Sequence, residues 1–141
     1  VSINTPGTRA IIGFVPQTGV ELDVVRFDAE TPFAVILLTS LDRTESIETA
    51  DRLLLTTVAR ARNTDMRFNE DKTELLDPGH APILLEPVSL NMNLNRNVSE
   101  INALDHAGRD RKASVPVNGQ TVFIDGETYQ TLYYEIICSD E

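Results

Sequence analysis

The chain has 141 residues, of which 41% are hydrophobic and 24% charged, and 12 basic against 22 acidic residues give a formal net charge of −10. This length suits one domain with its own hydrophobic core, residues 1–141. The acidic balance, with Lys and Arg scattered along the chain, argues against binding of nucleic-acid phosphates. The apolar run 33–38 is far shorter than the roughly 20 residues of a membrane-spanning helix, so we expect no membrane segment. Cys138 is the only cysteine, which excludes an internal disulfide and a cysteine-rich zinc site.

The chain begins at Val1 and shows no charged segment followed by an apolar one, so we expect it to carry no signal peptide of its own. We expect it to be a piece of a longer polypeptide. On that interpretation, the missing signal says nothing about where the parent protein works.

Turn-forming residues recur at intervals of roughly 8–15 residues, and the stretches between them are rich in β-branched, leucine and aromatic residues. The clearest predicted strands are residues 10–14, 20–27, 33–40, 83–87, 121–124 and 131–137. This spacing predicts an all-β fold, an antiparallel β-sandwich of the jelly-roll or immunoglobulin-like type.

The side-chain pattern within three segments makes the prediction more specific. Residues 20–24 alternate apolar and acidic residues, which predicts one solvated face, before the pattern slips phase at Val25. Residues 33–38 do not alternate, which predicts a central strand covered on both faces. The Asn118-Gly119 pair, flanked by apolar residues, predicts a tight hairpin turn.

Residues 51–63 fit a helical and a strand periodicity equally well. The β-branched run at residues 56–58 favours a strand, because such side chains lose rotamer freedom in a helix. We therefore predict a strand, with residues 44–50 as its lead-in. Residues 66–77 are the most polar stretch and are interpreted as a surface loop or hairpin tip.

Few residues suit catalysis. A nucleophilic triad needs a base, and His80 and His106 are the only histidines. Both fall in turn regions, where a histidine of a β domain is more often solvated, and no nucleophile-elbow pattern is present. Glu86 follows an apolar run and precedes a proline, and we interpret it as a turn or edge residue rather than a glycosidic acid.

The polar stretch supplies oxygen atoms that could bind calcium, from Asp65, Asn69, Glu70 and Asp71. The glycine-containing EF-hand pattern is absent, so we expect a solvated loop and no cofactor. The alternative is a structural calcium ion held by Asp65, Asn69 and Asp71. Two histidines and one cysteine offer too few ligands for a transition metal.

Carbohydrate binding would need aromatic platforms, and the chain has no Trp. Phe68 and Tyr129 are the best candidates for exposed platforms. Tyr133 is a third candidate, since Tyr133 and Tyr134 are adjacent in a strand and must point to opposite faces. Phe14 is a further candidate for such a platform.

Several segments, taken together and in order, resemble the β-sandwich domain that follows a catalytic (β/α)8 barrel in large bacterial glycoside hydrolases. The matching segments are INTPGTRAIIGF (3–14), PFAVILLTSLD (32–42), RLLLTTVARARNT (52–64), APILLEPV (81–88), LDHAGR (104–109) and YYEII (133–137).

The resemblance implies a non-catalytic accessory domain of a secreted, extracellular or periplasmic polysaccharide-degrading enzyme. Its partner would be the catalytic barrel of the same polypeptide, which it would support or cover, and which would carry the catalytic carboxylates. A direct contact with polysaccharide is left open, and the alternatives are an independent carbohydrate-binding module and a stand-alone enzyme.

Overall fold

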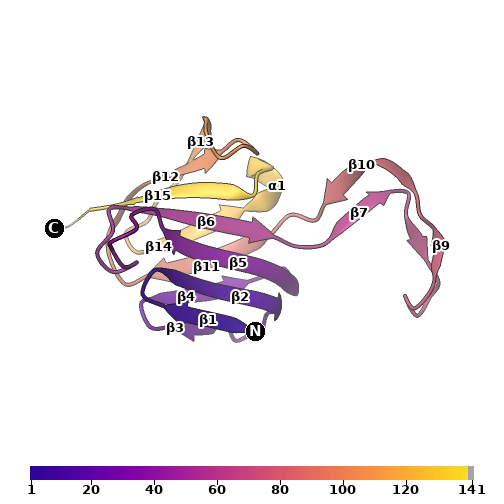
Figure 1. The fold of residues 1–141 in the computed structure, drawn as a ribbon, viewed down its shortest axis with the longest axis horizontal. Coiled ribbons are helices and arrows are strands. Elements are labelled where there is room, and N and C mark those ends of the chain that lie inside the picture. The colour runs from indigo at the N-terminus through magenta and orange to yellow at the C-terminus, as the bar shows by residue number, and fades with distance from the viewer. Residues whose placement is uncertain (140–141) are drawn as a thin grey trace.

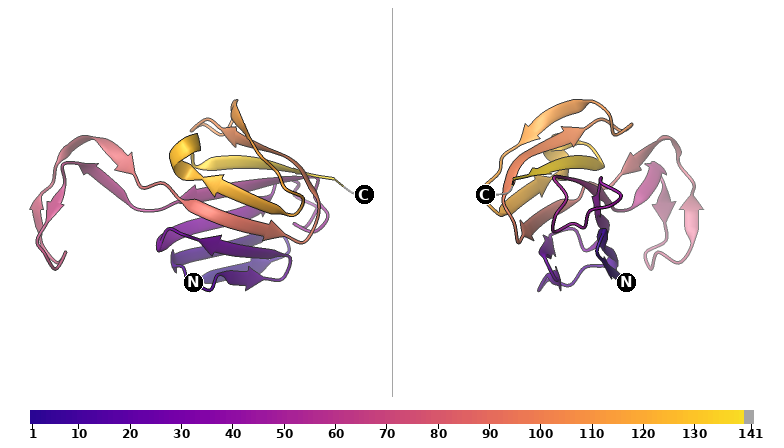
Figure 2. Two further views of the ribbon diagram at one scale, coloured as in Figure 1. Left: turned by 180° about the vertical axis from the view of Figure 1, so that it is seen from behind. Right: turned by 60° about the vertical axis from the view of Figure 1, so that its left-hand side comes forward.

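A computed structural model describes residues 1–139 of the chain. It confirms the all-β prediction: a seven-stranded and a four-stranded antiparallel sheet pack face to face as a β-sandwich (Figure 1). A long two-stranded arm leaves one end of the sandwich, as two further views also show (Figure 2). None of the helices in this part of the chain is long and apolar enough to cross a membrane.

The large sheet has the order β1-β2-β5-β6-β15-β12-β13. Its strands are β1 (Ser2–Thr5), β2 (Thr8–Phe14), β5 (Phe33–Ser40), β6 (Arg52–Val58), β15 (Tyr133–Cys138), β12 (Val98–Leu104) and β13 (Arg111–Val115). The small sheet has the order β14-β11-β4-β3, from β14 (Thr121–Asp125), β11 (Ser89–Leu94), β4 (Val25–Ala29) and β3 (Val20–Leu22). The arm contains β7 (Ala61–Thr64), β8 (Arg67–Phe68), β9 (Leu75–Asp77) and β10 (His80–Leu85), and one short helix, α1 (Gly126–Tyr129), joins β14 to β15.

The core lies between the two sheets because each strand directs every second side chain inward. Its largest fully buried side chains come from both layers: Phe27, Leu90, Met92, Leu94 and Ile124 from the small sheet, and Ile36, Leu38, Leu53, Leu55, Ile101 and Tyr134 from the large one. Tyr134 is buried and Tyr133 is partly exposed, which confirms that the two point to opposite faces.

The single strand predicted over residues 20–27 is wrong. The segment is a hairpin, in which β3 turns back onto β4 and Val20 pairs with Phe27. Asp23 sits in the turn with a left-handed φ of 49°. The phase slip at Val25 was the sign of this turn, since a turn lets both strands direct their apolar side chains to the same core.

Strand β5 is central, but it is not covered on both faces as predicted. Ala34, Ile36 and Leu38 are fully buried against the small sheet, while the side chains between them are only partly covered. The outer face of the large sheet therefore carries half-exposed apolar residues at Phe33, Val35, Leu37, Leu54 and Val58. The continuous apolar run of β5 therefore reflects apolar side chains on both faces of the strand, of which only the inner ones are buried.

The ambiguous segment 51–63 is strand, as predicted, but it forms two strands, β6 in the sandwich and β7 in the arm. The predicted lead-in 44–50 contains no strand and consists of turns held by Arg96, which donates hydrogen bonds to the carbonyl oxygens of Ile47 and Ala50 (3.0 and 2.8 Å). The Asn118-Gly119 turn forms, with an isolated bridge between Asn118 and Thr121. The strands before and after it belong to different sheets, so the turn marks a crossing between layers.

Glu135, on the outer face of the large sheet, is held by two arginines and makes stability depend on pH. Its carboxylate is buried and accepts hydrogen bonds from Arg52 and from Arg111 (3.3 Å). Burial raises its pKa, but the hydrogen bonds and charges of the two arginines outweigh burial and lower the pKa below the ordinary 4.5. A lowered folded-state pKa contributes stability that is present above the unfolded pKa and is lost as pH falls through the folded pKa.

We therefore expect the melting temperature of the wild-type chain to fall as pH is lowered below about 4.5, the ordinary pKa of Glu135. Glu135→Gln should flatten this part of the curve, measured by thermal unfolding at a series of pH values. The exposed Glu30→Gln should leave the curve unchanged. A Glu135→Gln curve with the wild-type slope would contradict the assignment.

Candidate functional site

The arm, residues 59–86, is the part of the structure that the hydrophobic core does not explain. Every residue of β10 is exposed, and three consecutive apolar side chains lie on it, Ile83, Leu84 and Leu85, with 65%, 53% and 42% exposure. Leu75 and Leu76 on β9 are also exposed. Because side chains alternate along a strand, Ile83 and Leu85 lie on one face of β10 and Leu84 on the other, so both faces of the arm expose apolar side chains. Exposed apolar surface of this kind marks interaction sites in soluble proteins.

Polar contacts hold the arm together in place of a core. At its base, Nε of Arg60 donates to Glu86 Oε2 (2.9 Å), and the Glu86 amide donates to the Arg60 carbonyl oxygen (2.8 Å). Further along, the Thr64 hydroxyl donates to the carbonyl oxygen of Pro82 (2.8 Å). Near the tip, Asn69 Oδ1 accepts from the amides of Thr73 and Glu74, closing the last turn.

Gly79 closes the bend before β10. Its φ of +67° is in the left-handed region, and a Cβ there would lie 2.2 Å from the carbonyl oxygen of Thr64. We expect Gly79→Ala to disorder the arm and to leave the sandwich folded, because the bend makes no contact with the core. Hydrogen exchange should show faster exchange at β7 and β10 with an unchanged melting temperature. A large loss of global stability would contradict this separation of the arm from the sandwich.

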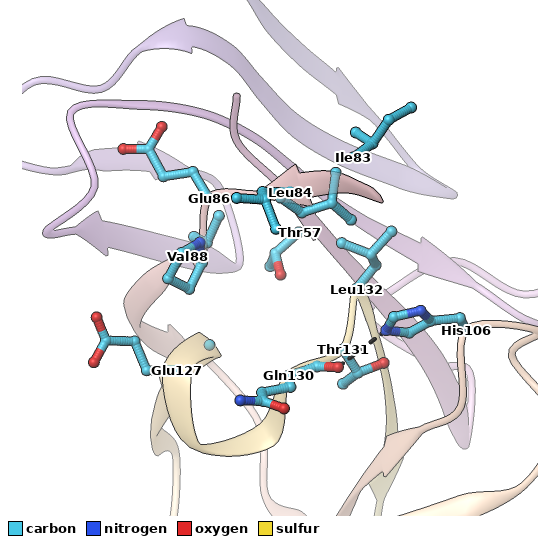
Figure 3. Close-up of a pocket in the computed structure, with 13 residues that line it drawn as sticks. Thr57, Ile83, Leu84, Glu86, Val88, His106, Glu127, Gln130, Thr131 and Leu132 are labelled. Atoms are coloured by element: carbon cyan, nitrogen blue, oxygen red, sulfur yellow. Dashed lines mark hydrogen bonds between the residues drawn. The ribbon is translucent and has the colours of Figure 1, made fainter. Parts of the chain in front are cut away.

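A cavity of about 610 Å³ lies where the arm meets the sandwich. Its walls come from the end of β10, the segment leading into β11, helix α1 and the start of β15 (Figure 3). The apolar lining consists of Ile83, Leu84, Leu85, Pro87, Val88 and Leu132. The polar lining consists of Thr57, Glu86, His106, Glu127, Gln130 and Thr131.

The corner formed by α1 shapes one wall of this cavity. Asp125 caps the helix: its carboxylate accepts hydrogen bonds from Thr128, both from the hydroxyl (2.6 Å) and from the amide, and these bonds lower its pKa. Gly126 then approaches Val88 so closely that a Cβ would lie 2.6 Å from both the amide nitrogen and the carbonyl oxygen of Val88. Across the cavity, His106 Nε2 lies 3.0 Å from the carbonyl oxygen of Gln130.

The three aromatic residues predicted for sugar binding lie in different parts of the fold. Phe68 is in the arm, half-buried, with the Arg62 guanidinium 5.5 Å from its ring centroid. Tyr129 packs on the core from α1, edge-on to Tyr134 at 6.1 Å. Tyr133 lies on the outer face of the large sheet. They do not form a common platform.

The other predicted site residues also take up defined places. His80 Nε2 lies 3.0 Å from Asp65 Oδ2, and both side chains are well exposed. Asn69 uses its side-chain oxygen within the arm's last turn, and Asp71 lies exposed in that turn. Within residues 1–139 no three His, Cys, Asp or Glu side chains gather closely enough to hold a metal ion. The calcium alternative stays a prediction.

The sequence interpretation named Phe14 as a candidate but expected Phe68 to be the most exposed aromatic side chain, which is wrong: Phe68 is half-buried, whereas Phe14 is 82% exposed and lies edge-on to Phe33 at 5.2 Å. It also missed the exposure of residues 83–85. The sequence of the strand that pairs with residues 83–85 indicated this exposure: β7 reads ARNT, which is too polar to form a hydrophobic core with them.

The chain matches no protein-family model, no curated protein and no solved structure.

Proposed function

We propose that this chain is a non-catalytic accessory domain of a secreted glycoside hydrolase, which docks on the catalytic (β/α)8 barrel through its arm. The observation that carries the proposal is β10, an apolar strand of which every residue is exposed. A monomeric protein gains nothing in solution from exposing Ile83, Leu84 and Leu85 together, whereas a docked one buries them. The sequence resemblance to sandwich domains that follow such barrels supplies the identity of the partner.

The outer face of the large sheet supports the same proposal. Its apolar residues Phe14, Phe33, Val35 and Val58 lie at the end of the sheet from which the arm leaves, since Val35 pairs with Val58, the last residue of β6. Glu135 on this face is paired with Arg52 and Arg111, and Arg111 is also paired with Glu100. A surface of this composition, apolar with neutralised charges, suits a stable interface between domains.

The test compares the 141-residue chain with the complete polypeptide encoded by its reading frame. We expect that polypeptide to contain a (β/α)8 barrel. Amide hydrogen exchange at residues 80–85 should be slower in the complete polypeptide by at least about tenfold, because docking removes these amides from solvent. Equal exchange in the two proteins, or a reading frame without a barrel, would overturn the proposal.

The exposed Phe14 favours a second candidate function, an independent carbohydrate-binding module. An aromatic ring exposed beside Phe33 can pack on the apolar face of a sugar ring. Affinity electrophoresis against a panel of plant and algal polysaccharides tests it, with Phe14→Ala, Phe68→Ala and Tyr129→Ala beside the wild type. Retardation by one glycan that Phe14→Ala abolishes would favour this candidate, and no retardation by any glycan would exclude it for the panel tested.

A further inference from the structure

The cavity at the base of the arm has a chemistry of its own. Apolar side chains lie around it: Leu84 comes from β10, Val88 from the segment just before β11 and Leu132 from the segment just before β15 (Figure 3). No Phe or Tyr side chain of residues 1–139 lines it, so it lacks the platform that a sugar ring would pack on. The six apolar residues of the lining suit an aliphatic side chain as the occupant, and the six polar ones can orient the group that follows it.

The charges around the cavity are unequal. Two carboxylates, Glu86 and Glu127, stand on the same side of it in Figure 3. Glu86 is paired with Arg60 at 2.9 Å, while Glu127 forms no ion pair within residues 1–139. The remaining titratable group, His106, lies across the cavity and is engaged by the carbonyl oxygen of Gln130. Together with the net charge of −10, this arrangement favours a cation beside Glu127.

The main chain of β10 favours an extended peptide. Among the described strands, β10 pairs only with β7, so one of its edges has unpaired main-chain groups. The Glu86 amide points toward the β7 side of the arm, where it donates to the Arg60 carbonyl oxygen. Successive amides along a strand point in opposite directions, so the Leu85 amide points to the free edge. A free strand edge beside an apolar cavity is the arrangement that extended peptides use to bind.

We propose that this cavity binds an extended segment of the docked protein that carries an aliphatic side chain followed by a lysine or arginine. The aliphatic side chain enters between Leu84, Val88 and Leu132, and the cation lies against Glu127. This inference rests on the proposed docking function and names the chemistry by which the arm's base would recognise its partner.

Methyl NMR of the 141-residue chain tests the proposal with two capped peptides, acetyl-Ala-Leu-Lys-Ala-amide and acetyl-Ala-Leu-Glu-Ala-amide. The lysine peptide should shift the methyl signals of Leu84, Val88 and Leu132, with a dissociation constant on the order of 1 mM. The glutamate peptide should bind about 2–5-fold more weakly, as expected for an exposed ion pair. Peptides that leave these methyl signals unchanged would overturn the proposal.

Two variants with matched controls locate the binding. Glu127→Gln should remove the preference for the lysine peptide, and Glu70→Gln, an exposed acid of the arm tip, should keep it. Leu84→Ser should weaken binding at least about fivefold by removing an apolar contact. Leu75→Ser should not, since Leu75 is similarly exposed but does not line the cavity. Equal effects of the Leu84 and Leu75 variants, or shifts produced by a glucose oligosaccharide instead of the peptides, would overturn the assignment.

The complete polypeptide separates this inference from the docking proposal. If residues 80–85 are protected there while Leu84→Ser and Glu127→Gln leave that protection unchanged, the arm docks but the cavity is not the recognition site. If residues 80–85 are not protected at all, the docking proposal itself fails.

Discussion

Ile36→Ala should lower the free energy of unfolding by about 2–5 kcal/mol. Ile36 lies in the middle of β5 and is fully buried, so truncation leaves a void between the two sheets that the surrounding strands can fill only in part. Chemical denaturation followed by circular dichroism measures the loss. The transition midpoint should move while the slope with denaturant stays the same.

The matched control is the same truncation in the arm. Ile83 is 65% exposed, so Ile83→Ala should change the free energy of unfolding by less than about 0.5 kcal/mol. The two variants remove identical atoms, and only burial distinguishes them. A loss of more than about 1 kcal/mol from Ile83→Ala would mean that the arm contributes to global stability and is not independent of the sandwich.

Gly126→Ala should destabilise the chain by about 1–3 kcal/mol, the usual effect of forcing extra atoms into a filled space. The added methyl group would lie 2.6 Å from two main-chain atoms of Val88, and this main chain leads directly into the paired strand β11, so it cannot move away as a flexible side chain can. The Gly126 amide, which donates to the Val88 carbonyl oxygen at 3.1 Å, would be displaced with it. Thermal and denaturant unfolding measure the effect.

Gly7→Ala is the control for this substitution. A Cβ at Gly7 would meet nothing within 4 Å. The same chemical change there should be neutral or slightly stabilising, because alanine restricts the unfolded chain. If Gly126→Ala were as well tolerated as Gly7→Ala, the close packing of α1 on Val88 would be disproved.

The fold class was predictable because its signal is repeated along the whole chain. Alternating or continuous apolar stretches between turn residues place the strands β2, β5, β14 and β15 within a few residues of their observed bounds. The order of the strands within each sheet was not predictable in this way. Strand β15 inserts between β6 and β12, and no local pattern carries the information for such a distant partner.

Local ambiguity explains the two errors within strands. The turn at Asp23 contains no glycine or proline and interrupts a regular alternation of apolar and acidic residues. The phase slip at Val25 was its only sign in the sequence. In β5 a continuous apolar run was interpreted as burial on both faces, although Val35 and Leu37 lie on an outer face that no second sheet formed by residues 1–139 covers.

The candidate site was harder to predict, because a cavity is a property of elements that meet in space. Leu84 is far in the sequence from Gln130 and Leu132 and shares no motif with them. They line the same cavity because β10 and the corner at α1 lie next to each other in the fold. The arm itself was partly visible in the sequence, since the polar stretch 66–77 was interpreted as a hairpin tip. Its length was not, because β7 and β10 have the composition of ordinary strands.

The way the arm is attached makes it an exchangeable part. Its two strands leave the sandwich side by side, since the Glu86 amide and the Arg60 carbonyl oxygen are hydrogen-bonded at 2.8 Å. A short turn could therefore join residues 59 and 87 without disturbing the core, which lies elsewhere. The same sandwich could carry arms of other lengths and compositions, so that partner choice can change in evolution while the stability of the scaffold is preserved.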